Sequence, residues 1–317
     1  MVTIEDIREA ADGLIGVAPA TPLVPAAGLE AIAGYPVYLK LENEHATGAF
    51  KMRGALTAVR RLSPAKRSTG VLTYSSGNHG QALAFAAQRM GIRAVVVMPE
   101  TAPATKVDGV KRWGGEVVFA GTTSEDRYTR GVEIAEVEGL TIIPPFDHPD
   151  IIAGQGTAGL EILEQLPEVG HVLFPVGGGG LGAGVTTALS ALRPEAKLTG
   201  VEPEGAAAYG AAVEAGRPVR LDETHSIADG LLPLSVGTIT FNHLFGRADA
   251  VTVSETAIAE ATLWLRGELG VMAEPSGAVT TAAIRTGAIK PIGPTVLIVS
   301  GGNADEKVLK DLANYIA

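Results

Sequence analysis

The chain has 317 residues, of which 46% are apolar and 19% are charged, and its formal net charge at pH 7 is −10. This length and composition predict a compact protein of one large or two medium domains and exclude a disordered chain. The acidic balance, without a block of five like charges, argues against nucleic-acid and anionic-membrane partners. Because the chain contains no cysteine, disulfides, thiolate catalysis and cysteine-based metal sites are excluded.

The N-terminal segment does not have the pattern of a targeting signal. Charged residues occupy its first turns, among them Glu5, Asp6 and Arg8, whereas a secretory signal needs a continuous apolar stretch. No apolar run in the sequence reaches the length that crosses a bilayer. We therefore expect a cytoplasmic protein without a membrane partner.

Short apolar runs alternate along the chain with longer stretches of helical character. The runs expected to form strands are residues 37–40, 70–74, 94–98, 116–119, 141–143, 171–176, 197–201 and 295–299. The stretches expected to form helices are residues 80–90, 104–113, 124–138, 156–165, 183–192, 254–269, 276–286 and 304–317. Short β-branched runs are typical of parallel strands buried on both faces, and their alternation with helices indicates βαβ units. The sequence thus predicts an open α/β sheet architecture.

Lys51 stands in an unusual setting for a lysine. Phe50 and a bend at Gly48 precede it, and Arg53 and Gly54 follow. A lysine forms Schiff bases with carbonyl compounds when burial or neighbouring cations lower its pKa. Read alone, the segment is equally consistent with a surface lysine at the start of a helix.

A glycine-rich run lies between the predicted strand 171–176 and the predicted helix 183–192. Its residues are Gly177, Gly178, Gly179, Gly180, Leu181 and Gly182. Backbone N–H groups of such a loop, backed by a helix N-terminus, form a cradle for an anion such as phosphate. A tight turn is a plainer interpretation, and the run also satisfies the dinucleotide pattern G-x-G-x-x-G. Its place past the midpoint of the chain favours the phosphate of another cofactor over a dinucleotide.

Two further motifs follow predicted strands. Ser75, Ser76, Asn78 and His79 belong to a Ser-Ser-Gly-Asn-His sequence that opens a helix. Hydroxyl, amide and free helix N–H groups suit a carboxylate, although an ordinary N-cap uses the same residue types. Ser300 ends the last predicted strand before Gly-Gly-Asn, where a simple strand-end turn is the alternative.

Together, the motifs at Lys51, Ser75, Gly177 and Ser300 resemble the pyridoxal-phosphate (PLP) enzymes of fold type II, in the branch of threonine dehydratases and serine racemases. The motifs occur in the family's order with similar spacing, from about residue 40 to residue 305. The resemblance implies two open twisted sheets flanked by helices, with PLP in the cleft between two domains.

The resemblance also implies a discontinuous division of the chain. Residues 1–69 and 148–317 would form a large PLP-binding domain. Residues 70–147 would form a small α/β domain inserted into it.

Roles for individual residues follow from the same resemblance. Lys51 would hold PLP covalently and remove the Cα proton of the substrate, and Phe50 would pack beside the cofactor. Asn78 would bind the phenolic oxygen of PLP and Ser300 its pyridine nitrogen, where a hydroxyl favours β-elimination over transamination. The residues that would bind the phosphate are Gly177, Gly178, Gly179, Gly180 and Leu181.

The substrate would be bound near the same loops. Ser75, Asn78 and His79 would surround its carboxylate, together with Ser76. Ser76 also holds the position that racemases of the family use as the acid–base opposite the lysine. Glu274 would lie near the PLP ring, although a carboxylate at a helix N-terminus is the plainer interpretation.

The chain departs from the family pattern at two places. Ala49 stands where the family commonly has serine before the Phe-Lys pair. Glu202 begins a stretch that binds metal in several relatives, but Ala208 replaces the second carboxylate. Because divalent cations require several oxygen ligands, we expect no divalent metal site, although Glu202 could support a monovalent cation.

The predicted activity is that of a PLP-dependent ammonia-lyase, which converts a β-hydroxy α-amino acid such as L-threonine or L-serine into a 2-oxo acid and ammonia. Alternatives within the family are an amino-acid racemase, a β-replacement enzyme, and a dehydratase for 3-hydroxyaspartate, phenylserine or a hydroxyectoine-derived substrate. A dinucleotide-binding oxidoreductase or a non-catalytic nucleotide-binding module is the alternative from another class. We expect a homodimer or homotetramer, and an unregulated catabolic type because little sequence follows the last motif.

Overall fold

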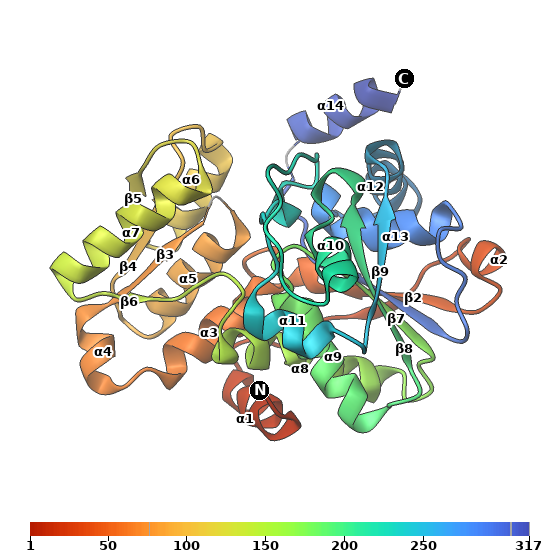
Figure 1. The fold of residues 1–317 in the computed structure, drawn as a ribbon, viewed down its shortest axis with the longest axis horizontal. Helices are drawn as coiled ribbons and strands as arrows, with labels where there is room; N and C mark the ends of the chain where they lie inside the picture. Colours follow the sequence, from red (N-terminus) through yellow and green to blue (C-terminus); the bar gives the residue numbers. More distant parts are fainter. Residues whose placement is uncertain (76, 305, 317) are drawn as a thin grey trace.

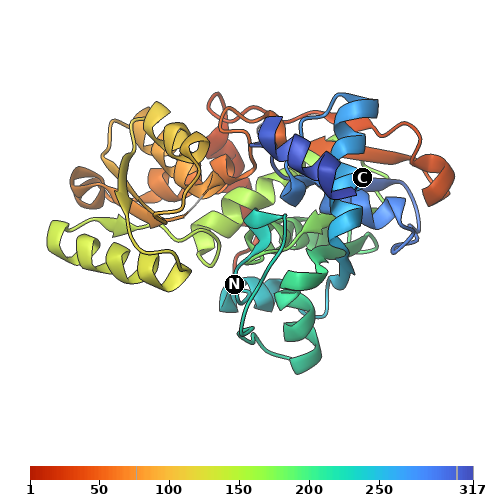
Figure 2. The same cartoon turned by 90° about the horizontal axis from the view of Figure 1, so that it is seen from above.

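The computed structural model describes residues 1–75, 77–304 and 306–316, which form two sheets flanked by helices (Figure 1). Ser76 lies outside the described residues, as do Asp305 and Ala317 at and near the end of the chain. Figure 1 shows the four-stranded sheet and its helices on one side of the molecule and the six-stranded sheet on the other. The same two parts lie side by side when seen from above (Figure 2). The predicted α/β fold class is confirmed.

The larger sheet has the strand order β1-β2-β10-β7-β8-β9. Its strands are β1 (Leu23–Pro25), β2 (Val37–Leu41), β7 (His171–Pro175), β8 (Lys197–Pro203), β9 (Asp249–Val253) and β10 (Thr295–Val299). All neighbouring strands are parallel except β1, which pairs antiparallel with β2. The carboxyl ends of β2, β7 and β10 therefore point the same way, and the loops that follow them share one edge of the sheet.

The smaller sheet has the order β5-β4-β3-β6 and is entirely parallel. Its strands are β3 (Val71–Tyr74), β4 (Ala94–Met98), β5 (Glu116–Phe119) and β6 (Thr141–Ile142). Alternate residues of β4 face opposite layers: Val96 and Met98 pack with α5 and α6, whereas Val95 and Val97 pack with α7. This two-sided burial explains the continuous apolar run in the sequence of β4.

Helices connect the strands and cover the two sheets. The α-helices are α1 (Ile4–Leu14), α2 (Glu30–Ala33), α3 (Lys51–Arg61), α4 (Pro64–Thr69), α5 (Asn78–Arg89), α6 (Ala104–Arg112), α7 (Ser124–Glu138), α8 (Pro149–Gln165), α9 (Gly180–Leu192), α10 (Ala208–Ala215), α11 (Thr238–Leu244), α12 (Glu255–Leu269), α13 (Pro275–Arg285) and α14 (Glu306–Ile316). Short 3-10 helices are η1 (Glu42–Glu44), η2 (Glu204–Ala206) and η3 (Asp229–Leu231). Helix α3 packs against both α5 and α8, so it joins the layers of the two sheets (Figure 1).

The large sheet is buried on both faces. Phe174, Val296 and Ile298 belong to a core with α8 and α9, whereas Leu173 and Leu297 belong to a core with α12 and α13. No helix in the described part of the chain combines the length and the apolar character needed to cross a membrane.

The eight predicted strands are present within two residues at each end, but β1 and β9 were not predicted. Both are edge strands of the larger sheet. The residues of β9 are mostly partly exposed or exposed, so the strand lacks the apolar pattern of a strand covered on two faces. Helix α8 begins at Pro149 rather than at residue 156, and six helices were not predicted, namely α1, α2, α3, α4, α10 and α11.

Candidate active site

Several of the predicted site residues follow the carboxyl ends of parallel strands. Asn78 begins α5 soon after β3, and the glycine loop leads from β7 into α9. Ser300 directly follows β10, and the backbone N–H of Phe50 donates to its carbonyl oxygen over 3.0 Å. An isolated bridge between Ala49 and Gly301 extends this contact. The loop that carries Lys51 is thereby attached to the end of β10.

The Lys51 side chain is half-buried. Its Nζ donates a 2.6 Å hydrogen bond to the carbonyl oxygen of Pro145 and lies 5.1 Å from the centre of the Phe50 ring. Burial lowers the pKa of Lys51 to about 8, because removal of water disfavours the charged amine. A substantial fraction of the amine is therefore neutral near pH 8, as a nucleophile or base must be.

The glycine loop has the features of an anion cradle. In the part of the chain that the structure describes, no protein group accepts the N–H groups of Gly177, Gly178 and Gly179. Gly179 adopts a φ of 90°, which a residue with a Cβ rarely adopts, and α9 begins at the next residue. Free N–H groups at a helix N-terminus favour a bound phosphate.

Asn78 belongs to a buried polar group with Glu274 and Asn303. Its Nδ2 donates to Oε1 of Glu274 over 2.6 Å, and its Oδ1 accepts from Nδ2 of Asn303 over 2.8 Å. Burial, with the nearby Asp229 charge, raises the pKa of Glu274 to about 7. The structure thus brings the predicted Glu274 and Asn78 into contact. Asn303 was not predicted as a site residue, although it is the last residue of the Ser-Gly-Gly-Asn motif that begins at Ser300.

Ser300 is buried and its Oγ donates to the carbonyl oxygen of Ser276 over 3.4 Å. Gly277, the next residue, lies against Gly301 so closely that a Cβ would meet the Gly301 carbonyl oxygen at 2.4 Å. The start of α13 therefore packs against the residues that follow β10. This contact fixes the Ser300 hydroxyl at the sheet edge from which the glycine loop also leaves.

The structure describes Ser75 and His79 but not Ser76. Ser75 Oγ accepts from the N–H of Gly77 over 3.3 Å. His79 Nε2 lies 3.1 Å from the carbonyl oxygen of Ile143, so this nitrogen carries the proton. Burial and the Lys51 charge lower the pKa of His79 to about 3, which makes its imidazole neutral at physiological pH. It contributes no positive charge to a carboxylate site.

A buried ion network lies beneath the first turn of α3. Arg53 binds both carboxylate oxygens of Glu42, with Nε 2.7 Å from Oε2 and Nη2 2.8 Å from Oε1. The same guanidinium contacts Glu161, whose Oε2 also accepts from Lys40 over 2.6 Å. Burial raises the pKa of Glu42, but Arg53 and His45 hold it well below its usual range. The network fixes α3 against β2 and α8.

The surroundings of Glu202 do not suit a divalent metal ion. Glu202 is fully buried, and its oxygens accept from the N–H groups of Tyr209 over 2.7 Å and Gly210 over 2.8 Å. Burial raises the pKa of Glu202 to about 7. Among the described residues no group of three metal-ligating side chains comes together. Two N–H groups at the start of α10, next to Ala208, therefore already bind both oxygens of the Glu202 carboxylate.

We therefore predict that activity does not depend on a divalent cation. Overnight treatment with EDTA followed by gel filtration should leave kcat and KM within about twofold of the untreated enzyme, because Glu202 is already satisfied by two amide donors. Addition of Mg²⁺, Ca²⁺ or Mn²⁺ should have no further effect. A loss of activity that one of these ions restores would contradict the prediction.

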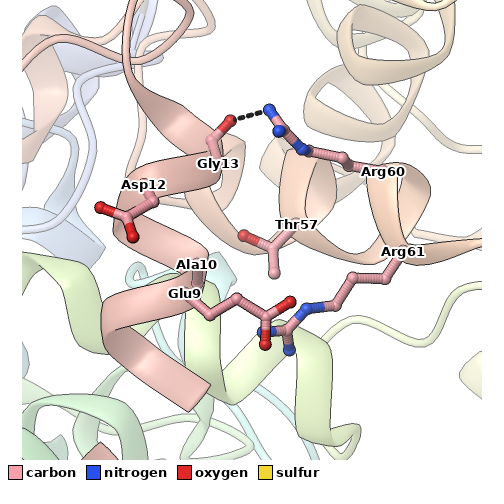
Figure 3. Close-up of a pocket in the computed structure, with 7 residues that line it drawn as sticks. All are labelled: Glu9, Ala10, Asp12, Gly13, Thr57, Arg60 and Arg61. Carbon is pink, nitrogen blue, oxygen red and sulfur yellow. Dashed lines mark hydrogen bonds and ion pairs between the residues drawn. The ribbon is translucent and has the colours of Figure 1, made fainter. Parts of the chain in front are cut away.

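A separate cavity of about 190 Å³ lies between α1 and α3 (Figure 3). It is lined by Glu9, Ala10, Asp12, Gly13, Thr57, Arg60 and Arg61. Its two guanidinium groups are already engaged: Arg60 donates to the Gly13 carbonyl oxygen and Arg61 pairs with Glu9 and Asp150. The cavity lies along later turns of α3 than Lys51, and we assign it no role in the reaction.

Comparison with known proteins identifies the class that this fold and site define. The chain belongs to the family of pyridoxal-phosphate dependent enzymes, whose family model matches residues 16–301. It is 39% identical to an L-threonine ammonia-lyase of Thermotoga maritima over 315 residues, which cover 99% of this chain and 79% of that protein. It is also 39% identical to an L-threo-3-hydroxyaspartate ammonia-lyase of a Pseudomonas species, with 95% of each chain covered.

The solved structure of maize serine racemase superimposes with a TM-score of 0.93 at 35% identity, over 99% of this chain and 97% of that chain. The resemblance to fold type II PLP enzymes and the dependence on PLP are thus confirmed, and the relatives support the predicted lyase class. The residues present also fit the cofactor: they offer a half-buried amine, a cradle of free N–H groups and a buried hydroxyl at one edge of a sheet.

Proposed function

We propose that the protein is a PLP-dependent ammonia-lyase that converts a β-hydroxy α-amino acid, such as L-threonine or L-serine, into a 2-oxo acid and ammonia. The observation that carries the proposal is the half-buried Lys51 amine, whose pKa is lowered to about 8, in a loop attached to the end of β10. The names of the ammonia-lyase relatives support the reaction class.

The roles of the residues follow from their chemistry. When bound, PLP supplies an electron sink that stabilises negative charge at the substrate α-carbon. Lys51 would hold the cofactor and, once displaced by the substrate amine, accept the Cα proton at Nζ. The Cα proton and the β-hydroxyl would together be lost as one water, and the enamine product, after conversion to its imine, would be hydrolysed to ammonia and the 2-oxo acid.

The other site residues would bind and orient. The N–H groups of residues 177–181 would hold the phosphate, the Ser300 hydroxyl the pyridine nitrogen and Asn78 the phenolic oxygen, with Phe50 beside the ring. A Glu274 carboxyl with a raised pKa, held by Asn78, would lie near the ring without adding a full negative charge at neutral pH. Ser75, Ser76, Asn78 and the start of α5 would bind the substrate carboxylate, with His79 as a neutral neighbour.

The identity of the substrate can be tested by incubating the protein with a panel of candidate amino acids and measuring the release of 2-oxo acid and ammonia. The panel contains L-threonine, L-serine, L-threo-3-hydroxyaspartate, L-threo-phenylserine and a hydroxyectoine-derived β-hydroxy amino acid. We expect equal amounts of the two products from L-threonine or L-serine, and none with the Lys51→Ala variant. Absence of 2-oxo acid with every member would contradict an ammonia-lyase.

Racemisation is the second candidate because a serine racemase of known structure is so similar in fold. Chiral analysis of serine recovered from the same reactions separates the two activities. We expect elimination to exceed formation of D-serine, and a dominant D-serine product would replace the proposed function by racemisation through Ser76. Because the matched family is defined by PLP, we do not retain the dinucleotide-binding alternative.

The remaining sequence predictions are kept as proposals. Residues 70–147, which include all four strands of the smaller sheet, would form the inserted domain between the two parts of the large domain, 1–69 and 148–317. The protein would act in the cytoplasm as a homodimer or homotetramer. A monovalent cation could bind near Glu202 through backbone carbonyls.

A further inference from the structure

The segment from Ile143 to Asp147, here called the strap, contacts several of the predicted site elements, although no role was predicted for it. It connects β6 with α8 and thus leads from the smaller sheet back to the larger part of the molecule. Its carbonyl groups hold two site side chains: the Ile143 oxygen lies 3.1 Å from His79 Nε2, and the Pro145 oxygen accepts from Lys51 Nζ over 2.6 Å.

The ring of Phe146, in the same strap, lies directly against the glycine loop. A Cβ placed on Gly178 would come within 2.2 Å of this ring, and one on Gly180 would meet Phe146 backbone and Cβ atoms at 3.1 to 3.3 Å. Because Gly178 and Gly180 have no Cβ, Phe146 can pack closely against the glycine loop. The strap thus touches both Lys51 and the glycine loop.

Asp147 anchors the end of the strap. Its Oδ1 accepts from the N–H groups of Ile239 over 2.9 Å and Thr240 over 3.1 Å, and its Oδ2 accepts from Thr238 over 3.1 Å. These are the first three N–H groups of α11, where a carboxylate is favoured. A Cβ on Gly237 would strike the Asp147 carboxylate at 2.2 Å, so the fit at this helix start is close.

Helix α11 also binds the glycine loop from the other side. Thr240 Oγ1 donates to the Gly178 carbonyl oxygen over 2.8 Å, and the Gly237 N–H donates to the same oxygen over 3.2 Å. Gly178 is thus held between the Phe146 ring and the start of α11, and Asp147 connects the two. One carboxylate therefore controls the position of the strap against both the loop and the lysine.

We propose that Asp147 is a positioning residue that fixes the Lys51 amine and the shape of the glycine loop for PLP. The proposal rests on the proposed function, in which these groups bind the cofactor. Asp147 acts through Pro145, Phe146 and α11. Loss of its carboxylate lets the strap shift, so that the amine loses its carbonyl partner and Gly178 loses its packing.

The test is the dissociation constant for PLP, measured by titration of cofactor-free protein and followed by absorbance and by circular dichroism of the bound cofactor. For Asp147→Ala we expect the constant to rise at least about tenfold, with a changed cofactor dichroism, because three hydrogen bonds to a charged acceptor are lost. Asp147→Asn retains one acceptor oxygen, and we expect an intermediate constant, about threefold above that of the unsubstituted protein.

Asp150→Ala is the matched control. Asp150 lies three positions further along the chain, and its carboxylate pairs with Arg61 over 2.8 Å and makes none of the contacts that hold the strap. It should leave the PLP constant and the dichroism unchanged. The amino-acid KM of Asp147→Ala at saturating PLP should stay within about twofold, since the residue contacts the cofactor site only indirectly.

Three results would overturn the proposal. The first is an Asp147→Ala protein that binds PLP with unchanged affinity and dichroism, even if its thermal stability falls. The second, decisive if Asp147→Ala does not fold, is an Asp147→Asn protein identical to the unsubstituted one in both readouts. The third is an equal loss of PLP affinity in Asp150→Ala. Failure of the unsubstituted protein to bind PLP would instead overturn the proposed function and remove the basis of the inference.

Discussion

Replacement of Lys51 by alanine should remove the absorbance of covalently held PLP and lower kcat by at least about 10³-fold, because the same amine holds the cofactor and accepts the Cα proton. The measurement is the absorption spectrum and the rate of 2-oxo acid release, each taken with excess PLP. Lys197→Ala is the control, since Lys197 is a partly exposed lysine paired with Asp249 on the larger sheet.

The control variant should retain the spectrum and rate of the unsubstituted enzyme. A Lys51→Ala protein that keeps both the cofactor band and the rate would show that another group carries the chemistry. Loss of both in Lys197→Ala as well would show that the effect is not specific to Lys51.

Arg53→Met should lower the free energy of unfolding by about 3 to 5 kcal/mol, because it leaves the buried Glu42 and the half-buried Glu161 without their shared guanidinium. Glu42 is fully buried, and Arg53 donates to both of its oxygens. Methionine keeps much of the side-chain volume, so the loss reports mainly on charge and hydrogen bonding. Urea denaturation followed by circular dichroism supplies the measurement.

Arg93→Met provides a matched comparison, since Arg93 also pairs with two carboxylates, Glu116 and Glu138, but does so at the surface. Exposed pairs are screened by water, and we expect a loss of no more than about 1 kcal/mol. Equal losses in the two variants, or a small loss in Arg53→Met, would contradict the role given to the buried network.

The edge at which the site is formed could be predicted because parallel strands place their following loops together. The strands β7 and β10 are buried on both faces, so each appears in the sequence as a continuous apolar run. The glycine loop and Ser300 follow these runs directly. The edge strand β9 lacks such a run, which is why the sequence did not reveal it.

The strap could not be predicted for a different reason. Pro145, Phe146 and Asp147 act through a backbone carbonyl, a ring contact and a helix cap, and their partners are about 30 to 90 residues away in sequence. None of these interactions needs a motif that repeats or a special spacing. The same holds for Glu42 and Glu161, whose pairing with Arg53 becomes visible only when β2, α3 and α8 are packed together.

The most direct test of the account is to identify the residue that carries PLP. Reduction of the PLP-loaded enzyme with borohydride fixes the cofactor to its lysine, and mass spectrometry of a proteolytic digest then locates the phosphopyridoxyl group. We predict that the group is found on Lys51 in the peptide that contains Phe50 and Arg53. A modification of any other lysine, or a reduced protein without the group, would contradict the account at its centre.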